Sequence, residues 1–168
     1  MDACTQCYMS IWRSLKPVVC KIRGDAVAGG SDIALVCDII IMTDTGRIGY
    51  PPARVWGCPT TAMWVYRVGL TWAKRLLLTG DLIDGKVAER IGLAWKSVPD
   101  EKLDEETNAL LQRMITIPKN QLMMQKMVIN QAIESMGLVR IFGASKINVK
   151  LMCQPFPACR LQHSVLLH

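Results

Sequence analysis

A run of small residues, AVAGGSD at positions 26–32, offers the clearest chemistry in this sequence. Gly29 and Gly30 lie between an apolar run that predicts a buried strand and one that predicts a helix. Adjacent glycines leave backbone N–H groups accessible, because no side chain covers them. A helix N-terminus adds unpaired donors and partial positive charge, so the turn suits a phosphate or a thioester enolate oxygen. The same residues also fit a purely structural turn, since GxGxxG and GK[ST] are both missing.

The sequence contains few candidate residues for other kinds of catalytic site or for a metal site. The two histidines, His163 and His168, lie near the C-terminus, which argues against a buried Ser-His or Cys-His pair. Cys4 and Cys7 have the spacing of a zinc or redox motif, but no second pair at matching spacing accompanies them. The sequence therefore predicts no metal site.

Composition places the chain among globular proteins. It has 168 residues, of which 51% are apolar, enough for one domain with a real core and too many for a disordered chain. The longest apolar stretch, residues 33–42, includes Asp38 and is too short to cross a bilayer, so no membrane association is expected. The first ten residues lack a basic segment followed by an apolar one, so we do not expect a secreted protein. Seven cysteines without a regular framework predict reduced thiols inside the cell, in cytoplasm or mitochondrion.

The net charge of +6 is unevenly distributed. Residues 1–139 carry 16 basic and 14 acidic side chains, a balance of only +2. Residues 140–168 contain four basic residues and no acid. A nucleic-acid surface would require a basic stripe interleaved with aromatic residues on the folded part, and none is visible. Nucleic acid is therefore not the expected partner, although RNA or surface binding through the basic tail is an alternative.

The elements around the glycines have the order of an α/β crossover unit. Residues 18–22 predict a buried strand, and residues 39–42 predict a second one. Between them lie a small-residue turn over 24–31 and a helical apolar pattern over 33–37, closed by Asp38. Strand, turn, helix and strand in this order predict two parallel strands.

The second half of the chain is predicted to be mostly helical. Three short helices are predicted over 60–68, 71–79 and 84–92. Each of these segments begins at a residue with a hydroxyl or carboxylate side chain, such as Asp84, and ends at or next to a glycine. A strand over 94–98 and two further helices follow, the last running from Pro118 to about Met136. We divide the sequence into a domain at 1–139 and an atypical basic tail at 140–168.

Several motifs in a fixed order resemble the enoyl-CoA hydratase/isomerase (crotonase) family. They cover about residues 10–138 and include KPVVCKIRG at 16–24, AVAGGSDIALVCD at 26–38, IGYP at 48–51, RVG at 67–69, AKRLLLTG at 73–80, AERIGL at 88–93, and Lys126 with Asn130. The resemblance implies a partial crotonase (ClpP/crotonase-like) α/β fold, with strand-turn-helix units followed by a helical C-terminal region. In this family an oxyanion hole of backbone N–H groups stabilises the enolate of an acyl-CoA thioester.

The resemblance assigns roles to individual residues. Gly29 maps to an oxyanion N–H, and its neighbours Ala28 and Gly30 are expected to line the substrate. Family hydratases use two glutamates, whose positions are held here by Asp32 and Pro52. By this resemblance Asp32 is expected to be catalytic, orienting water or a proton, and Pro52 is expected to line the substrate. Proline has no titratable group, so two-glutamate hydration is not expected.

Two more residues near Pro52 are candidate substrate-binding groups. Tyr50 and Arg54 stand beside the second acid position of the family and could serve a different reaction. Arg54 could equally be a surface or phosphate-facing cation.

The resemblance also implies partners. The expected ligand is an acyl-CoA, with no cofactor besides the CoA thioester as substrate, and the expected assembly is a homo-oligomer of the trimer type. Hydratase, isomerase and hydrolase activities stay open. Because the family domain starts well before this sequence does, the alternative is a truncated, catalytically inactive product.

Overall fold

The predicted crossover unit forms the centre of the fold. The computed structural model describes residues 3–55 and 57–138, so the tail at 140–168 lies outside the described residues. Strands β1 (Val19–Ile22) and β3 (Ile39–Thr43) pair in parallel, with Val19 opposite Ile39. Helix α2 (Gly29–Val36) connects them, after a short additional strand, β2 (Asp25–Val27). The parallel pair and its helical connection confirm the sequence prediction.

The strands form two small sheets. The first has the order β1-β3-β6, in which β6 (Lys96–Val98) also runs parallel to β3. In the second, β4 (Arg47–Gly49) pairs in parallel with β2 and antiparallel with β5 (Leu82–Asp84). The sequence predicted a turn where β2 lies and predicted neither β4 nor β5, because three-residue strands are too short to show periodicity.

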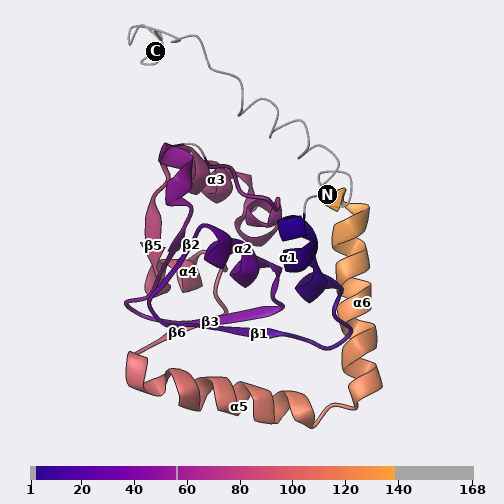
Figure 1. Cartoon of the computed structure of the whole chain (residues 1–168). Coiled ribbons are helices and arrows are strands. Elements are labelled where there is room, and N and C mark those ends of the chain that lie inside the picture. The colour runs from indigo at the N-terminus through magenta and orange to yellow at the C-terminus, as the bar shows by residue number, and fades with distance from the viewer. Residues whose placement is uncertain (1–2, 56, 139–168) are drawn as a thin grey trace, which may run out of the picture.

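Strand β3 separates two hydrophobic clusters. Ile40 and Met42 belong to the larger one, with residues of α2 and of the helices beyond it. Ile41 faces the smaller one, which includes Leu103 and Leu110 of α5 (Leu103–Ile115). Figure 1 shows the same layers, with α1 (Ala3–Arg13) and α2 on one side of the sheet and α5 on the other. The continuous apolar run of β3 is thus buried on both faces.

The remaining helices surround this centre. Helix α3 (Met63–Thr79) joins the two predicted helices through a kink at Gly69, whose φ of 72° a glycine adopts easily. Helix α4 (Gly85–Arg90) begins as predicted at Asp84, whose carboxylate accepts the Val87 N–H. The described residues also form the 3₁₀ turns η1 (Pro51–Arg54) and η2 (Asp100–Lys102). No helix in the described ranges is long and apolar enough to cross a membrane.

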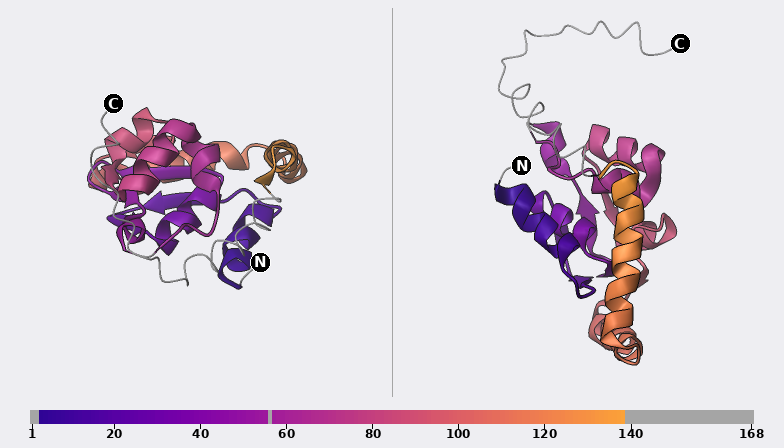
Figure 2. Two further views of the ribbon diagram at one scale, coloured as in Figure 1. Left: turned by 90° about the horizontal axis from the view of Figure 1, so that it is seen from above. Right: turned by 90° about the vertical axis from the view of Figure 1, so that its right-hand side faces the viewer.

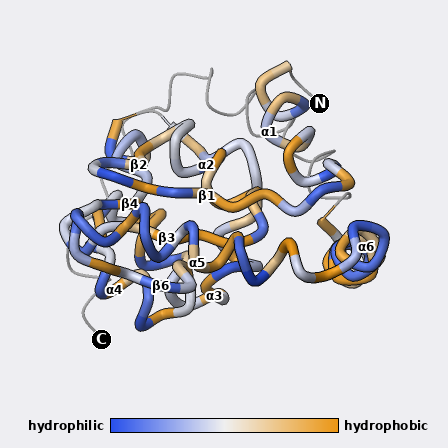
Figure 3. Tube along the Cα trace, turned by 90° about the horizontal axis from the view of Figure 1, so that it is seen from below, coloured by the Kyte–Doolittle hydropathy of each residue, from blue (hydrophilic) through white to orange (hydrophobic). Residues whose placement is uncertain are grey.

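Helix α6 (Lys119–Ser135) stands along one side of the molecule, as two views in Figure 2 show. Lys126 is 6% exposed, and its ammonium donates to the carbonyls of Ile11 and Lys16 and to the Asp38 carboxylate at 2.8 Å. One turn later, the Asn130 amide donates to the backbone of α1. These polar contacts fasten α6 to the connection between α1 and β1. Seen end-on in Figure 3, α6 gathers hydrophobic residues towards one side.

Candidate functional site

The candidate site begins at the junction between β2 and α2. The Ala28 carbonyl accepts the N–H groups of Ser31 and Asp32, at 3.0 and 3.1 Å, and the Ser31 hydroxyl at 2.7 Å. Gly29 and Gly30 are the first residues of the helix, so their N–H groups precede its first internal hydrogen bond. Two backbone donors at a positive helix end can bind a carbonyl oxygen or an anion.

The backbone at this junction is strained. Ala28 has φ 51° and ψ −122°, a region that residues with a Cβ rarely adopt. Such a conformation costs about 1–3 kcal/mol and persists only where neighbouring contacts enforce it. The bonds from Ser31 and Asp32 supply that enforcement. Strain concentrated at a helix N-terminus is typical of a functional turn.

Tyr8 of α1 lies against the glycine turn. A Cβ placed on Gly29 would lie 2.8 Å from the Tyr8 hydroxyl oxygen and 3.7 Å from the ring carbon that carries it. A Cβ on Gly30 would meet nothing within 4 Å. Gly29 is therefore covered by a phenol, whereas the space beside Gly30 is open.

Asp32 is a buried carboxylate that holds a neighbouring segment. Its side chain accepts the Thr60 N–H at 3.4 Å and the Thr60 and Thr61 hydroxyls at 3.2 Å. The residue is 1% exposed, and this burial raises the pKa of Asp32 although the threonine hydrogen bonds act to lower it. Both carboxylate oxygens are thus engaged by the segment that leads into α3.

This raised pKa predicts a pH-dependent contribution to stability. A carboxyl that titrates higher in the folded than in the unfolded chain stabilises the fold fully only below its unfolded pKa of about 4. As pH rises through the folded pKa, that contribution is lost. We expect the wild type to lose stability relative to Asp32→Asn as the pH is raised above about 4, as measured by urea unfolding. A pH-independent difference between the two proteins would contradict this assignment.

Tyr50 lies beside Asp32, but its hydroxyl already makes a hydrogen bond within the protein. It is 7% exposed, and its hydroxyl donates to the Cys58 carbonyl at 2.9 Å. Burial, followed by the proximity of Asp32, Cys58 and Tyr8, raises the pKa of Tyr50 to about 12. The phenol therefore stays protonated at neutral pH and acts as a hydrogen-bond donor, not as a base.

Pro52 and Arg54, both on η1, make structural contacts. The Pro52 carbonyl accepts the Gly57 N–H at 2.7 Å. The Arg54 guanidinium donates to the Thr79 carbonyl and to the Asp81 carboxylate, each at 2.8 Å. These contacts place Arg54 at the end of α3 and the start of β5, and its substrate-binding role stays a prediction.

The structure therefore gathers only part of the predicted set around the glycines. Asp32 lies close enough to Tyr50 to oppose ionisation of its phenol, and the Tyr8 hydroxyl lies beside Gly29. Sequence reasoning missed Tyr8, because a tyrosine on an amphipathic helix carries no motif. It also missed the Thr60–Thr61 pair, although a buried carboxylate must find hydrogen-bond donors somewhere.

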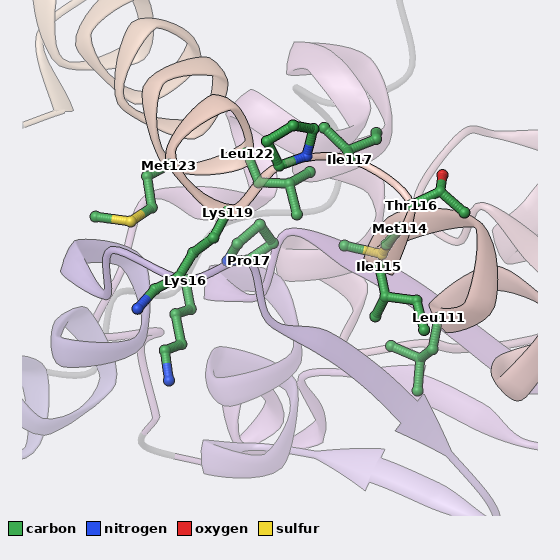
Figure 4. Close-up of a pocket in the computed structure, with 11 residues that line it drawn as sticks. Lys16, Pro17, Leu111, Met114, Ile115, Thr116, Ile117, Lys119, Leu122 and Met123 are labelled. Carbon is green, nitrogen blue, oxygen red and sulfur yellow. The ribbon is translucent and has the colours of Figure 1, made fainter.

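A separate apolar groove of about 520 Å³ lies where α5 meets α6 (Figure 4). Leu111, Met114, Leu122 and Met123 contribute to its walls, and the charged groups lining it are those of Lys16 and Lys119. None of the predicted site residues lines this groove. The groove is therefore distinct from the glycine turn. Its hydrophobic volume is weaker evidence for a functional site than the backbone donors of that turn.

The described residues include no group of three or more metal-ligating side chains that could hold an ion. Five cysteines lie in the same part of the chain and all carry free thiols, namely Cys4, Cys7, Cys20, Cys37 and Cys58.

Comparisons with known proteins point to one family. The sequence profile of the enoyl-CoA hydratase/isomerase family matches residues 2–158. Over 144 residues the chain is 30% identical to the mitochondrial enoyl-CoA hydratase of Pongo abelii, covering 84% of this chain and 48% of that protein. A solved enoyl-CoA hydratase from Mycobacterium smegmatis matches with a TM-score of 0.84 and 40% identity, covering 88% of this chain and 51% of that one.

A second solved structure agrees with this result. An enoyl-CoA hydratase/isomerase from Xanthobacter autotrophicus Py2 matches with a TM-score of 0.83 and 25% identity, covering 88% of this chain and 56% of that one. The chain thus spans about half the length of the relatives that it matches.

Proposed function

The chain belongs to the enoyl-CoA hydratase/isomerase family, and on this premise we propose that it binds an acyl-CoA whose thioester oxygen accepts the Gly29 N–H. The observation that carries this proposal is the strained β2–α2 junction, which places two glycines at the positive end of a helix. A backbone donor there favours an oxygen on which negative charge develops, as in an enolate. Gly30 supplies open space beside it, since a Cβ there would meet no neighbouring atom.

Asp32 is a positioning residue in this proposal. Its carboxylate is fully buried and holds Thr60 and Thr61, so it orders the segment next to the site. Pro52 provides no acid, and therefore the two-glutamate hydration of the family has no counterpart here. The chemistry that the residues support is polarisation of the thioester carbonyl. The trimer-type assembly and the reducing compartment stay predictions.

The experiment compares two ligands that differ only at the carbonyl. Butyryl-CoA carries the thioester oxygen, whereas its thioether analogue S-butyl-CoA does not. We expect the chain to bind butyryl-CoA about three- to tenfold more tightly by calorimetry, the usual value of one hydrogen bond. Free CoA measures the contribution of the shared nucleotide. Equal affinities for the two acyl ligands would remove the role of Gly29, and no binding of either would reject the proposal.

A second candidate function is acyl-CoA binding without turnover. It is favoured by the same residues, because Pro52 lacks an acid and Asp32 is occupied by two threonines. Proton exchange separates the two functions. Release of deuterium from α-deuterated butyryl-CoA, followed by NMR, requires that water accept the α-deuteron as the enolate forms, whereas a binding protein leaves the label in place.

A further inference from the structure

The groove at the junction of α5 and α6 has a charged end and an apolar end. In Figure 4 the side chains of Lys16 and Lys119 extend to one end of it, whereas Leu111 and Ile115 lie at the other. Among the described residues, no acid lines the groove and neither ammonium takes part in an ion pair. The charged end is therefore suited to an anionic group.

Backbone contacts hold the walls of the groove in place. The Ile117 N–H donates to the Met114 carbonyl at 3.1 Å in the turn that follows α5, and Pro118 then leads into α6. At the entry to β1, the Lys16 carbonyl accepts the buried Lys126 ammonium at 3.2 Å. The groove is thus preformed, so a ligand does not have to order its walls.

The rest of the lining is suited to an alkyl chain. The volume of about 520 Å³ lies within the usual range of small-molecule sites, about 300–1,000 Å³. Ile115 is 70% exposed and Ile117 is 37% exposed, although both are large aliphatic residues. Apolar surface gathered in this way is unfavourable in water and marks binding grooves. A chain of methylene groups would cover it without requiring hydrogen bonds.

We propose that this groove binds a fatty acid, with the carboxylate between Lys16 and Lys119 and the alkyl chain along Leu122 towards Leu111. A neutral occupant would leave both ammonium groups without a counter-ion. Residues 140–168 of the sequence contain four basic residues and no acid, so they do not complement the charge of the groove. The site shares no residue with the glycine turn and does not depend on the acyl-CoA proposed there.

The first test compares decanoate with decanol, which share an alkyl chain and differ in charge. We expect the full chain to bind decanoate about three- to twentyfold more tightly, as measured by displacement of a fluorescent fatty acid. The double variant Lys16→Met, Lys119→Met should lose this preference and keep its affinity for decanol. Lys74→Met with Lys102→Met is the matched control, because both lysines are exposed and lie outside the groove.

Two results of this test would overturn the inference. A preference for decanoate that survives the loss of Lys16 and Lys119 would show that these lysines do not hold the carboxylate. Displacement of decanoate by butyryl-CoA would place the fatty acid at the acyl-CoA site instead of the groove. A chain that binds decanoate but no butyryl-CoA would reject the proposed function alone.

The second test examines the alkyl chain. Decanoate should bind about tenfold more tightly than octanoate, because each buried methylene contributes about three- to fourfold. Ile117→Ser should weaken decanoate binding about three- to tenfold, whereas Val128→Ser, an exposed aliphatic position outside the groove, should not. Equal affinities for octanoate and decanoate would overturn the inference. A dimer in sedimentation that Ile117→Ser dissociates, with no decanoate binding, would assign the groove to a second copy instead.

Discussion

Replacing Lys126 by methionine is expected to lower the free energy of unfolding by about 3–5 kcal/mol, the usual cost of breaking a buried ion pair. Lys126 is 6% exposed and pairs with Asp38 at 2.8 Å. The same ammonium donates to the carbonyls of Ile11 and Lys16, which lie more than a hundred residues away in sequence. Its loss removes the buried cation that pairs with Asp38 and takes one hydrogen-bond donor from each of the two carbonyls. Urea unfolding of the full chain measures the change.

A second variant separates lost charge pairing from lost packing. Asp38→Asn keeps an oxygen to accept the Val18 N–H, which the Asp38 carboxylate accepts at 2.6 Å. In the Lys126→Met background it removes the unpaired negative charge, so the double variant should regain at least about 1 kcal/mol. Lys21→Met is the matched control, because the ion pair of Lys21 with Asp104 is exposed and should matter little. A double variant as unstable as Lys126→Met alone would contradict this account.

The case of Lys126 shows where sequence reasoning stops. Its spacing to Asn130 was recognised as part of a family motif, but the reason for the lysine is a set of long-range contacts. An isolated helix pattern does not reveal that an ammonium is buried against Ile11, Lys16 and Asp38. Only the folding of α6 onto the α1–β1 connection brings these groups together.

Elements with a long and uniform pattern were predictable, and short ones were not. The apolar run of β3 and the helix before it gave the correct parallel crossover, since burial on both faces leaves a continuous hydrophobic signal. Strands β4 and β5 have three residues each, and their pairing depends on each other rather than on their own sequences. Gly69 was expected to end a helix, and instead it kinks one.

The candidate site was predictable where backbone chemistry decides it. Two glycines were predicted in the turn between a strand and a helix, and the structure places Gly29 and Gly30 as the first two residues of α2. Side-chain contacts depended on neighbours from other elements, which sequence patterns do not reveal. Arg54 turns to the end of α3, and the phenol nearest to Gly29 comes from α1.

Gly49→Ala is expected to destabilise the fold by about 3 kcal/mol, at the upper end of ordinary overpacking effects. Gly49 pairs with Leu82 across β4 and β5. A Cβ on Gly49 would collide with the Asp81 carbonyl and would lie 2.8 Å from Leu82 Cδ2 and 3.2 Å from Leu82 Cα. The closest of these atoms belongs to the backbone, so rotation of a side chain cannot relieve the overlap.

The matched control for this substitution is Gly30→Ala. Both glycines belong to family motifs, but a Cβ on Gly30 would meet nothing within 4 Å. Because alanine also restricts the unfolded chain, Gly30→Ala should change stability by no more than about 1 kcal/mol. Thermal and urea unfolding of both variants give the comparison. Equal destabilisation would mean that the glycines are needed for backbone conformation, whereas a large effect at Gly49 alone identifies close packing of β4 on β5 as the reason for that glycine.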